Sequence, residues 1–167
     1  MYELRELDVD DGIEIYKMLQ DIKKNENGFQ NKAKGLTFAE FKDYLKSNKR
    51  MSKGKDLPSD YVPQTIYWFL VDDYPVGMGK LRHYLNDLLK KRGGHASYAV
   101  RRSKRKKGYG KLILRELIKK AEKKGLTELL ITCDNSNIAS KKIIEANGGK
   151  LEKIVKKECF YKIKVSQ

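Results

Sequence analysis

The sequence predicts an α/β fold in which a mixed β-sheet is flanked by helices on both faces. In the second half of the chain, short apolar runs alternate with segments whose apolar residues recur at helical spacing. In the first half, two helical patterns precede two adjacent strand patterns. With 167 residues and a hydrophobic fraction of 40%, the chain can bury a sizeable core, and we expect one domain over residues 1–167.

The first 63 residues predict a strand, two helices and a loop. Residues 2–7 alternate and predict a strand, and Asp10 or Asp11 can cap the helix that follows. Thr37 and Glu40 have the spacing of a capping box, which predicts the start of a second helix. Residues 46–63 are polar and contain two prolines, which predicts a loop. The apolar stripe of the first helix, which should end at residues 25–28, consists of Ile15, Met18, Leu19 and Ile22.

The middle of the chain predicts a β-hairpin, a short helix and one more strand. The hairpin turns at residues 72–74, and the short helix should end at Gly93 and Gly94. The further strand leads directly into a strongly basic segment. These elements, in chain order, cover residues 65–71, 75–83, 85–91 and 95–100.

The last third of the chain predicts two helices and three strands. One helix follows the basic segment and stops at Gly125. Residues 127–133 form a continuous apolar run, as expected for a strand covered on both faces. Asn137 caps a helix that ends by Gly149, and two strands at residues 150–155 and 158–164 complete the fold.

The composition restricts the partners and the compartment. The net charge of +15 attracts acidic partners, but only eight of the 37 basic residues are arginines, which favours a solvated surface over a nucleic-acid interface. Cys133 and Cys159 match no metal spacing and predict a reduced intracellular protein without a metal site. The sequence contains neither a signal peptide nor a membrane-spanning run, so we expect a cytoplasmic protein that does not bind membranes.

The basic segment Arg101–Lys111 combines positive charge with backbone freedom. Six of its first seven residues are cationic, and Gly-Tyr-Gly follows them. A glycine-rich turn between a strand and a helix aims several backbone N–H groups at one point, where the helix N-terminus adds partial positive charge. Gly108 and Gly110 allow the backbone to approach a ligand closely. The segment therefore predicts a phosphate site, and a solvated charged turn is the alternative.

Two common phosphate-binding motifs are absent from this segment. The Walker A motif requires Ser or Thr after Gly-Lys, whereas Leu112 follows Lys111. The dinucleotide fingerprint requires a third glycine where Ile113 stands.

The sequence Arg-Lys-Lys-Gly-Tyr-Gly at residues 105–110 resembles the Arg/Gln-x-x-Gly-x-Gly/Ala loop of the GNAT acyltransferases. The segment from Asn137 to Gly149 is similar to the second cofactor segment of that family, and the order of elements over residues 65–165 agrees with its fold. The resemblance implies a GNAT-like acyl-CoA N-acyltransferase fold that uses acetyl-CoA as its cofactor.

The resemblance also implies roles for individual residues. The strand before the loop would carry a bulge and diverge from the next parallel strand, and pantetheine in the gap would bond to Ala99 and Val100. The Tyr98 backbone N–H would point at the thioester carbonyl, where aminolysis develops an oxyanion. Asn137 and Ser140 would contact the cofactor or simply cap their helix. The residues that would wrap the pyrophosphate are Arg105, Lys106, Lys107, Gly108, Tyr109, Gly110 and Lys111.

The sequence departs from the family at one position in the second cofactor segment. Many members place a tyrosine in the second segment as a proton donor to the departing thiolate, and Ile144 stands at the matching position. Either another group near the thiol protonates it, or the thiolate leaves unaided. Three further side chains are interpreted as structural: His83 and His95 at strand ends, and Cys133 as a small buried residue.

The leading hypothesis is an acetyl-CoA-dependent N-acetyltransferase that acts by direct attack of a primary amine. The acceptor, a small molecule or a peptide, would enter opposite the cofactor between the first two helices and the loop at residues 46–63. The alternatives are a basic RNA- or ribosome-binding module and a non-catalytic CoA-binding sensor on the same fold. A monomer and a homodimer are both compatible with the sequence.

Overall fold

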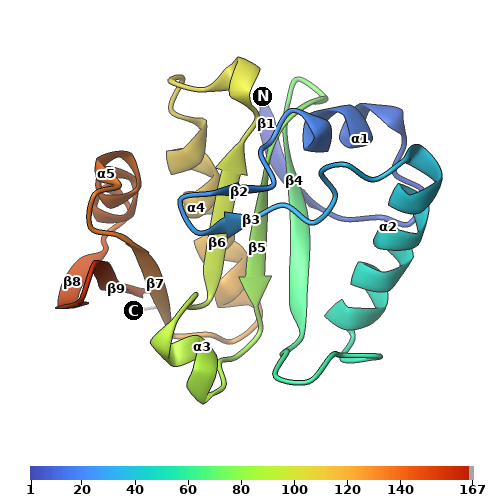
Figure 1. Ribbon diagram of the computed structural model, residues 1–167. Helices are drawn as coiled ribbons and strands as arrows, with labels where there is room; N and C mark the ends of the chain where they lie inside the picture. The colour runs from blue at the N-terminus through green and yellow to red at the C-terminus, as the bar shows by residue number, and fades with distance from the viewer. Residues whose placement is uncertain (166–167) are drawn as a thin grey trace.

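The computed structural model describes residues 1–165, whose elements form three layers of strands and helices (Figure 1). The elements in chain order are β1 (Tyr2–Glu6), α1 (Ile13–Gln20), β2 (Asn25–Glu26), β3 (Phe29–Gln30), α2 (Phe38–Ser52), β4 (Gln64–Val71), β5 (Tyr74–Arg82), α3 (Asp87–Lys91), β6 (Ala96–Val100), a 3₁₀ turn (Arg102–Lys104), α4 (Tyr109–Lys123), β7 (Glu128–Asp134), α5 (Ile138–Ala146), β8 (Lys150–Val155) and β9 (Glu158–Lys164).

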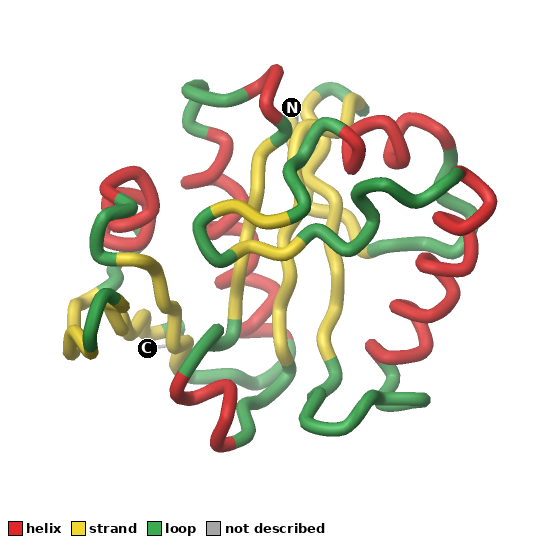
Figure 2. Tube along the Cα trace, in the orientation of Figure 1, coloured by secondary structure: helices red, strands yellow, loops and turns green. Residues whose placement is uncertain are grey.

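The long strands divide into two sheets. One sheet has the order β1-β4-β5-β6 and the other β7-β9-β8, and the pairing within each is antiparallel. Figure 2 shows the second sheet set to one side of the first, with α5 beside it. The predicted α/β class is confirmed, and the chain passes from one sheet to the other through α4.

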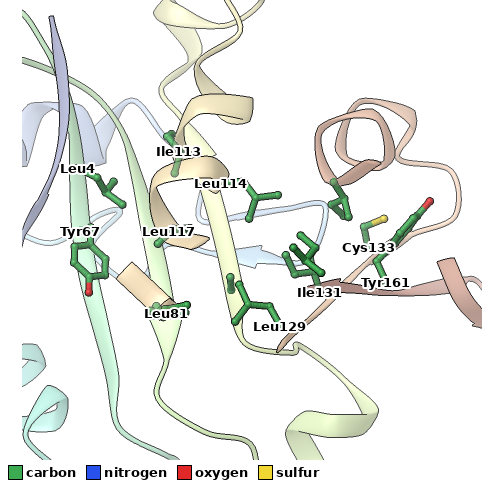
Figure 3. Close-up of a cluster of buried hydrophobic side chains, with 14 of the residues drawn as sticks. Leu4, Tyr67, Leu81, Ile113, Leu114, Leu117, Leu129, Ile131, Cys133 and Tyr161 are labelled. Carbon is green, nitrogen blue, oxygen red and sulfur yellow. The ribbon is translucent and has the colours of Figure 1, made fainter. Parts of the chain in front are cut away.

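Two hydrophobic clusters lie on opposite faces of the first sheet. Helix α4 covers one face, where Ile113, Leu114 and Leu117 join residues of β7 and β9 (Figure 3). Helices α1 and α2 cover the other face, where Met18, Phe41 and Leu45 pack beneath Trp68 and Met78. Because β4 lies between both clusters, residues 65–70 are buried without interruption, which explains their continuous apolar run.

Asp11 does not cap the first helix as the sequence predicted, and neither does Asp10. The N-cap of α1 is Gly12, which makes no side-chain hydrogen bond there. Asp11 is only 7% exposed, and its carboxylate accepts hydrogen bonds from Trp68 Nε1 at 2.7 Å and from Arg5 at 2.7 Å. A buried indole N–H requires an acceptor, and Asp11 supplies it across 57 residues of sequence.

Three other local predictions need correction, while the capping box of Thr37 and Glu40 is confirmed. Helix α2 continues to Ser52, so the predicted loop begins seven residues later than expected. Residues 25–28 form a two-stranded hairpin with Phe29 and Gln30 rather than a simple turn. Strand β7 alternates between buried and less buried residues, because it lies at the edge of its sheet with one face on the core.

Candidate active site

The two sheets diverge between β6 and β7. At the start of β6, His95 N–H donates to the Leu130 carbonyl at 2.8 Å, and Leu130 N–H donates to His95 Nδ1 at 2.9 Å. Beyond this point no ladder joins β6 to β7 within residues 1–165. His95 is therefore the last tie between the two strands, which agrees with its interpretation as structural, and burial lowers its pKa.

The backbone of β6 alternates between the β5 side and this gap. Arg82 N–H donates to the His95 carbonyl, and Arg101 N–H donates to the Val76 carbonyl, in a continuous register that pairs Met78 with Ala99. In an antiparallel ladder every second residue bonds the partner strand. Ala99 therefore bonds β5, whereas the N–H and C=O groups of Tyr98 and Val100 face the gap. The register of β6 contains no bulge, and the irregularity lies instead between β4 and β5.

The side chain of Tyr98 extends from β6 toward α5. Its hydroxyl lies 2.9 Å from Ser140 Oγ, and Ser140 N–H donates to Asn137 Oδ1 at 3.1 Å. Asn137 is thus the cap of α5, and Ser140 links that cap to Tyr98. Burial raises the pKa of Tyr98 to about 12 and that of the Cys133 thiol to about 11, so both groups are protonated at neutral pH. Cys133 belongs to the core, as the sequence indicated.

The loop before α4 presents a row of open backbone donors. None of the seven N–H groups from Arg105 to Lys111 donates a hydrogen bond within residues 1–165. Lys106 and Gly108 have φ of 64° and 80°, and Gly108 is the N-cap of the 15-residue helix α4 without a side-chain cap. Because the helix dipole adds positive potential here, the loop suits an anion that can accept several N–H bonds.

Two arginines of the basic segment, Arg101 and Arg105, are engaged in internal contacts. Arg105 Nε donates to the Val100 carbonyl at 3.0 Å, and its guanidinium lies 2.5 Å from Glu26, whose pKa this contact lowers. Arg101 is buried and pairs with Asp21 at 3.0 Å. The Arg105–Glu26 pair fastens the β2–β3 hairpin to the end of β6, and Figure 1 shows this hairpin crossing β6. Lys106, Lys107 and Lys111 are exposed, so they carry the free positive charge of the loop.

Two glycine-segment residues have packing roles that the sequence did not reveal. A Cβ on Gly110 would lie 2.8 Å from Ile143 Cδ1, so a larger residue here would displace the end of that side chain, and glycine favours close packing of α4 on α5. The Tyr109 ring lies 5.9 Å from that of Phe69 and belongs to the core border. Gly108 differs, since nothing lies within 4 Å of its Cβ position and its positive φ is the constraint.

Ile144, where the family resemblance places a tyrosine, points into the core. It is 0% exposed, and a Cβ on Gly149 would lie 2.4 Å from its Cγ2. Ile144→Ala is expected to lower the free energy of unfolding by about 2–5 kcal/mol through cavity formation. Urea unfolding measures this loss, and Lys142→Ala, an exposed position on the same helix, should change it by less than about 0.5 kcal/mol. Equal effects of the two variants would show that Ile144 is not a packing residue.

A cavity of about 190 Å³ lies on the opposite face of the sheet. Helix α2, the loop before β4, and strands β4 and β5 line it with residues that include Tyr44, Tyr61 and Lys80. Helix α2 and the loop, which were predicted to border an acceptor site, line this cavity, whereas α1 does not. The sequence did not indicate that Lys32 and Lys80 line a common cavity, because neither residue belongs to a motif and the two come together only in the folded chain.

Lys80 is expected to destabilise the fold at neutral pH. Burial and the nearby charges of Arg82 and Lys32 lower its pKa to about 8, below the 10.5 of an unfolded chain. Between these two pKa values the unfolded state binds the proton more strongly than the folded state. The loss of folding stability caused by Lys80 is therefore complete below pH 8 and disappears as the pH rises to 10.5. Lys80→Met should therefore unfold at higher urea than wild type at pH 7, and the difference should shrink at pH 10.5. A difference that is independent of pH would contradict this.

Residues 1–165 contain no cluster of three or more His, Cys, Asp or Glu side chains that could hold a metal ion. Within the same residues, no helix is long and apolar enough to cross a bilayer.

Comparisons with known proteins relate the chain to a family. The model of the acetyltransferase (GNAT) family matches residues 34–148. No curated protein matches the chain.

Solved structures share the fold at low identity. An N-acetyltransferase from Staphylococcus aureus has a TM-score of 0.67 at 20% identity, with 99% of each chain covered. RimL, a ribosomal L7/L12 alpha-N-protein acetyltransferase in complex with coenzyme A, has a TM-score of 0.74 at 15% identity, covering 98% of this chain and 93% of that one. The Campylobacter jejuni N-acetyltransferase PseH, in complex with acetyl coenzyme A, has a TM-score of 0.63 at 14% identity, covering 99% and 100%. Since the family model spans well over half of the sequence, the chain belongs to the GNAT acetyltransferase family.

Proposed function

We propose that the protein is an acetyl-CoA-dependent N-acetyltransferase that transfers an acetyl group directly to a primary amine. The observation that carries the proposal is the row of seven open N–H groups at Arg105–Lys111, at the N-terminus of α4 and beside the gap between β6 and β7. Acetyl-CoA combines a pyrophosphate, which needs such donors, with an extended pantetheine arm, which needs an open strand edge. RimL and PseH, which share the fold, have coenzyme A or acetyl coenzyme A bound.

The residues of β6 would hold the arm and polarise the thioester. The backbone groups of Tyr98 and the N–H of Val100 face the gap, while the Val100 carbonyl accepts from Arg105 Nε. The Val100 N–H is therefore favoured over Ala99 as the partner of pantetheine. The Tyr98 N–H would donate to the carbonyl oxygen on which negative charge develops, an effect of about 3 kcal/mol for a fixed oxyanion donor. Proximity of amine and thioester would supply much of the remaining rate enhancement.

The loop and α5 would hold the phosphates. The backbone N–H groups of residues 105–111 would bind the pyrophosphate, with Lys106, Lys107 and Lys111 as free counter-charges. The Arg105 guanidinium pairs with Glu26 and donates to the Val100 carbonyl. We therefore propose that this side chain stabilises the conformation of the loop, in place of the direct pyrophosphate contact predicted from the sequence. Asn137 and Ser140 would contribute through the cap of α5, with any contact to the cofactor additional to that role.

The acceptor amine would approach from the α2 face, opposite the cofactor. Tyr98 is the titratable side chain of β6, and its hydroxyl lies 2.9 Å from Ser140 on α5, the helix that also carries Ile144. Burial raises its pKa to about 12, so it is protonated at neutral pH. It would serve as the proton source if the departing thiolate needs one. Both described cysteines are free, which fits a reducing cytoplasm. The proposed acceptor is a small molecule or a peptide, without a nucleic-acid partner.

Release of free CoA from acetyl-CoA during an amine screen tests this function. We expect CoA to raise the melting temperature, because a ligand at 100 times its dissociation constant adds about 2.7 kcal/mol to the free energy of unfolding. We also expect release of the CoA thiol that depends on the added amine. CoA binding without any transfer across primary amines and peptide N-termini would favour the non-catalytic sensor. Absence of CoA binding would exclude both functions.

A further inference from the structure

The cavity beneath α2 is unusually positive for the site of a cationic substrate. Its nine lining residues include Lys32 and Lys80 but no aspartate or glutamate. Lys32 Nζ donates to the Tyr61 hydroxyl at 2.5 Å and lies 4.8 Å from that ring. Lys80 donates to the Gln30 carbonyl and lies 4.6 Å from the Phe29 ring. The two ammonium groups are thus held by neutral partners.

No carboxylate among residues 1–165 forms an ion pair with these cationic groups. Within residues 1–165, Lys32, Lys80 and Arg82 form no ion pair within 4 Å. Arg82 and Lys32 both lie close enough to Lys80 to disfavour its protonated form. Three like charges near one partly enclosed space raise its affinity for an anion.

The cavity lies on the acceptor side of the proposed transfer site. Lys80 pairs in register with Ile66 on β4 and with Ser97 on β6, and Ser97 precedes Tyr98. Ile66 also lines the cavity, which places it on the α2 face. A volume of about 190 Å³ corresponds to roughly six water molecules, so the space suits a small group and not a folded domain.

We propose that this cavity binds a carboxylate or phosphate group of the acceptor, so that the enzyme acetylates small anionic amines or the acidic end of a peptide. The inference rests on the proposed function. The lysines bind the anionic group and also disfavour an ammonium ion nearby, which favours the neutral amine that attacks the thioester. Tyr44, Ser47 and Gln64 add neutral polar side chains to the same wall.

Matched acceptors test the inference. The probes are β-alanine against β-alaninamide and phosphoethanolamine against ethanolamine, which differ in the anionic group, with Lys32→Gln/Lys80→Met as the variant. Lys55→Gln, an exposed lysine that does not line the cavity, is the control. We expect kcat/KM of wild type to favour the anionic member of a pair at least tenfold, and the preference to fall on the order of tenfold for each lysine removed. The two pairs distinguish carboxylate from phosphate. Preference for the neutral members, or a preference that survives in the double variant, would overturn the inference.

A binding measurement separates this inference from the proposed function. Glutarate, a dicarboxylate without an amine, is titrated into the CoA-free protein and followed by calorimetry. Binding that the double variant loses and the control retains supports the anionic cavity even if no amine in the panel reacts. Absence of glutarate binding to a wild type that still binds CoA would refute the cavity assignment and leave the proposed function standing.

Discussion

Tyr98→Pro is expected to lower kcat by about a hundredfold to a thousandfold, the effect of losing one fixed oxyanion donor. The register of β6 directs the Tyr98 N–H into the gap and away from β5, so a proline there removes this donor without removing a ladder bond. The measurement is the steady-state rate of CoA release with an acceptor from the amine screen, accompanied by calorimetric CoA binding to show that the site persists.

Two variants at the same position control for the side chain. Tyr98→Ala removes the ring and its bond to Ser140, and Tyr98→Phe removes only the hydroxyl, while both retain the N–H. We expect both to remain within about tenfold of wild-type kcat, because a thiolate is a good leaving group that can depart without a proton donor. A loss of about a hundredfold or more in Tyr98→Phe would instead assign proton donation to the Tyr98 hydroxyl. If Tyr98→Ala loses as much as Tyr98→Pro, the backbone donor does not carry the catalysis and the side chain does.

Charge reversal at Lys106→Glu/Lys107→Glu is expected to weaken CoA binding on the order of a hundredfold. The two lysines are exposed and unpaired within residues 1–165, so their loss should leave the fold intact while it removes two counter-charges next to the open N–H groups. The dissociation constant of CoA, measured by calorimetry at fixed salt, reports the effect.

The matched control lies at the other end of the same helix. Lys123→Glu/Lys124→Glu makes an equal change in net charge roughly 20 Å away along α4, at a cost of about 0.3–1 kcal/mol at the helix C-terminus. CoA affinity should fall less than about threefold in this variant. An equal loss in both variants would indicate that only the overall charge of the protein matters and that the loop is not the binding site.

The sequence predicted local features of the site better than its side-chain partners. The Thr37 capping box, the Asn137 cap and the position of the Gly-rich loop all depend on residues a few positions apart, and each is confirmed. The ion pair between Arg105 and Glu26 could not be predicted from the sequence. It depends on a short hairpin at residues 25–30, whose sequence indicates only a turn. Asp11 was predicted as a possible helix cap because its actual hydrogen-bond partner, Trp68, lies 57 residues away in the sequence.

Two features of the site could be recognised only from the three-dimensional arrangement of the chain. The cationic cavity joins Lys32 from the chain before α2 to Lys80 on β5, and neither residue has a neighbour in sequence that signals binding. Gly110, which was predicted to admit a ligand, also lies close to Ile143, because helix α5 begins 28 residues later and packs against α4 at that point. Spacing predicted which loop should bind an anion, and packing determined which of its residues are free to do so.

The backbone N–H groups of residues 105–111, together with those of Tyr98 and Val100, are proposed to bind acetyl-CoA. Amide chemical shifts of the ¹⁵N-labelled protein during titration with CoA test this proposal most directly, because each donor gives its own signal. We predict saturable shifts, largest at Arg105–Lys111 and at Tyr98 and Val100, with small changes at the far end of α4 near Lys123. Saturable shifts elsewhere with none in the loop, or no saturable shift at all, would show that these N–H groups do not bind the cofactor.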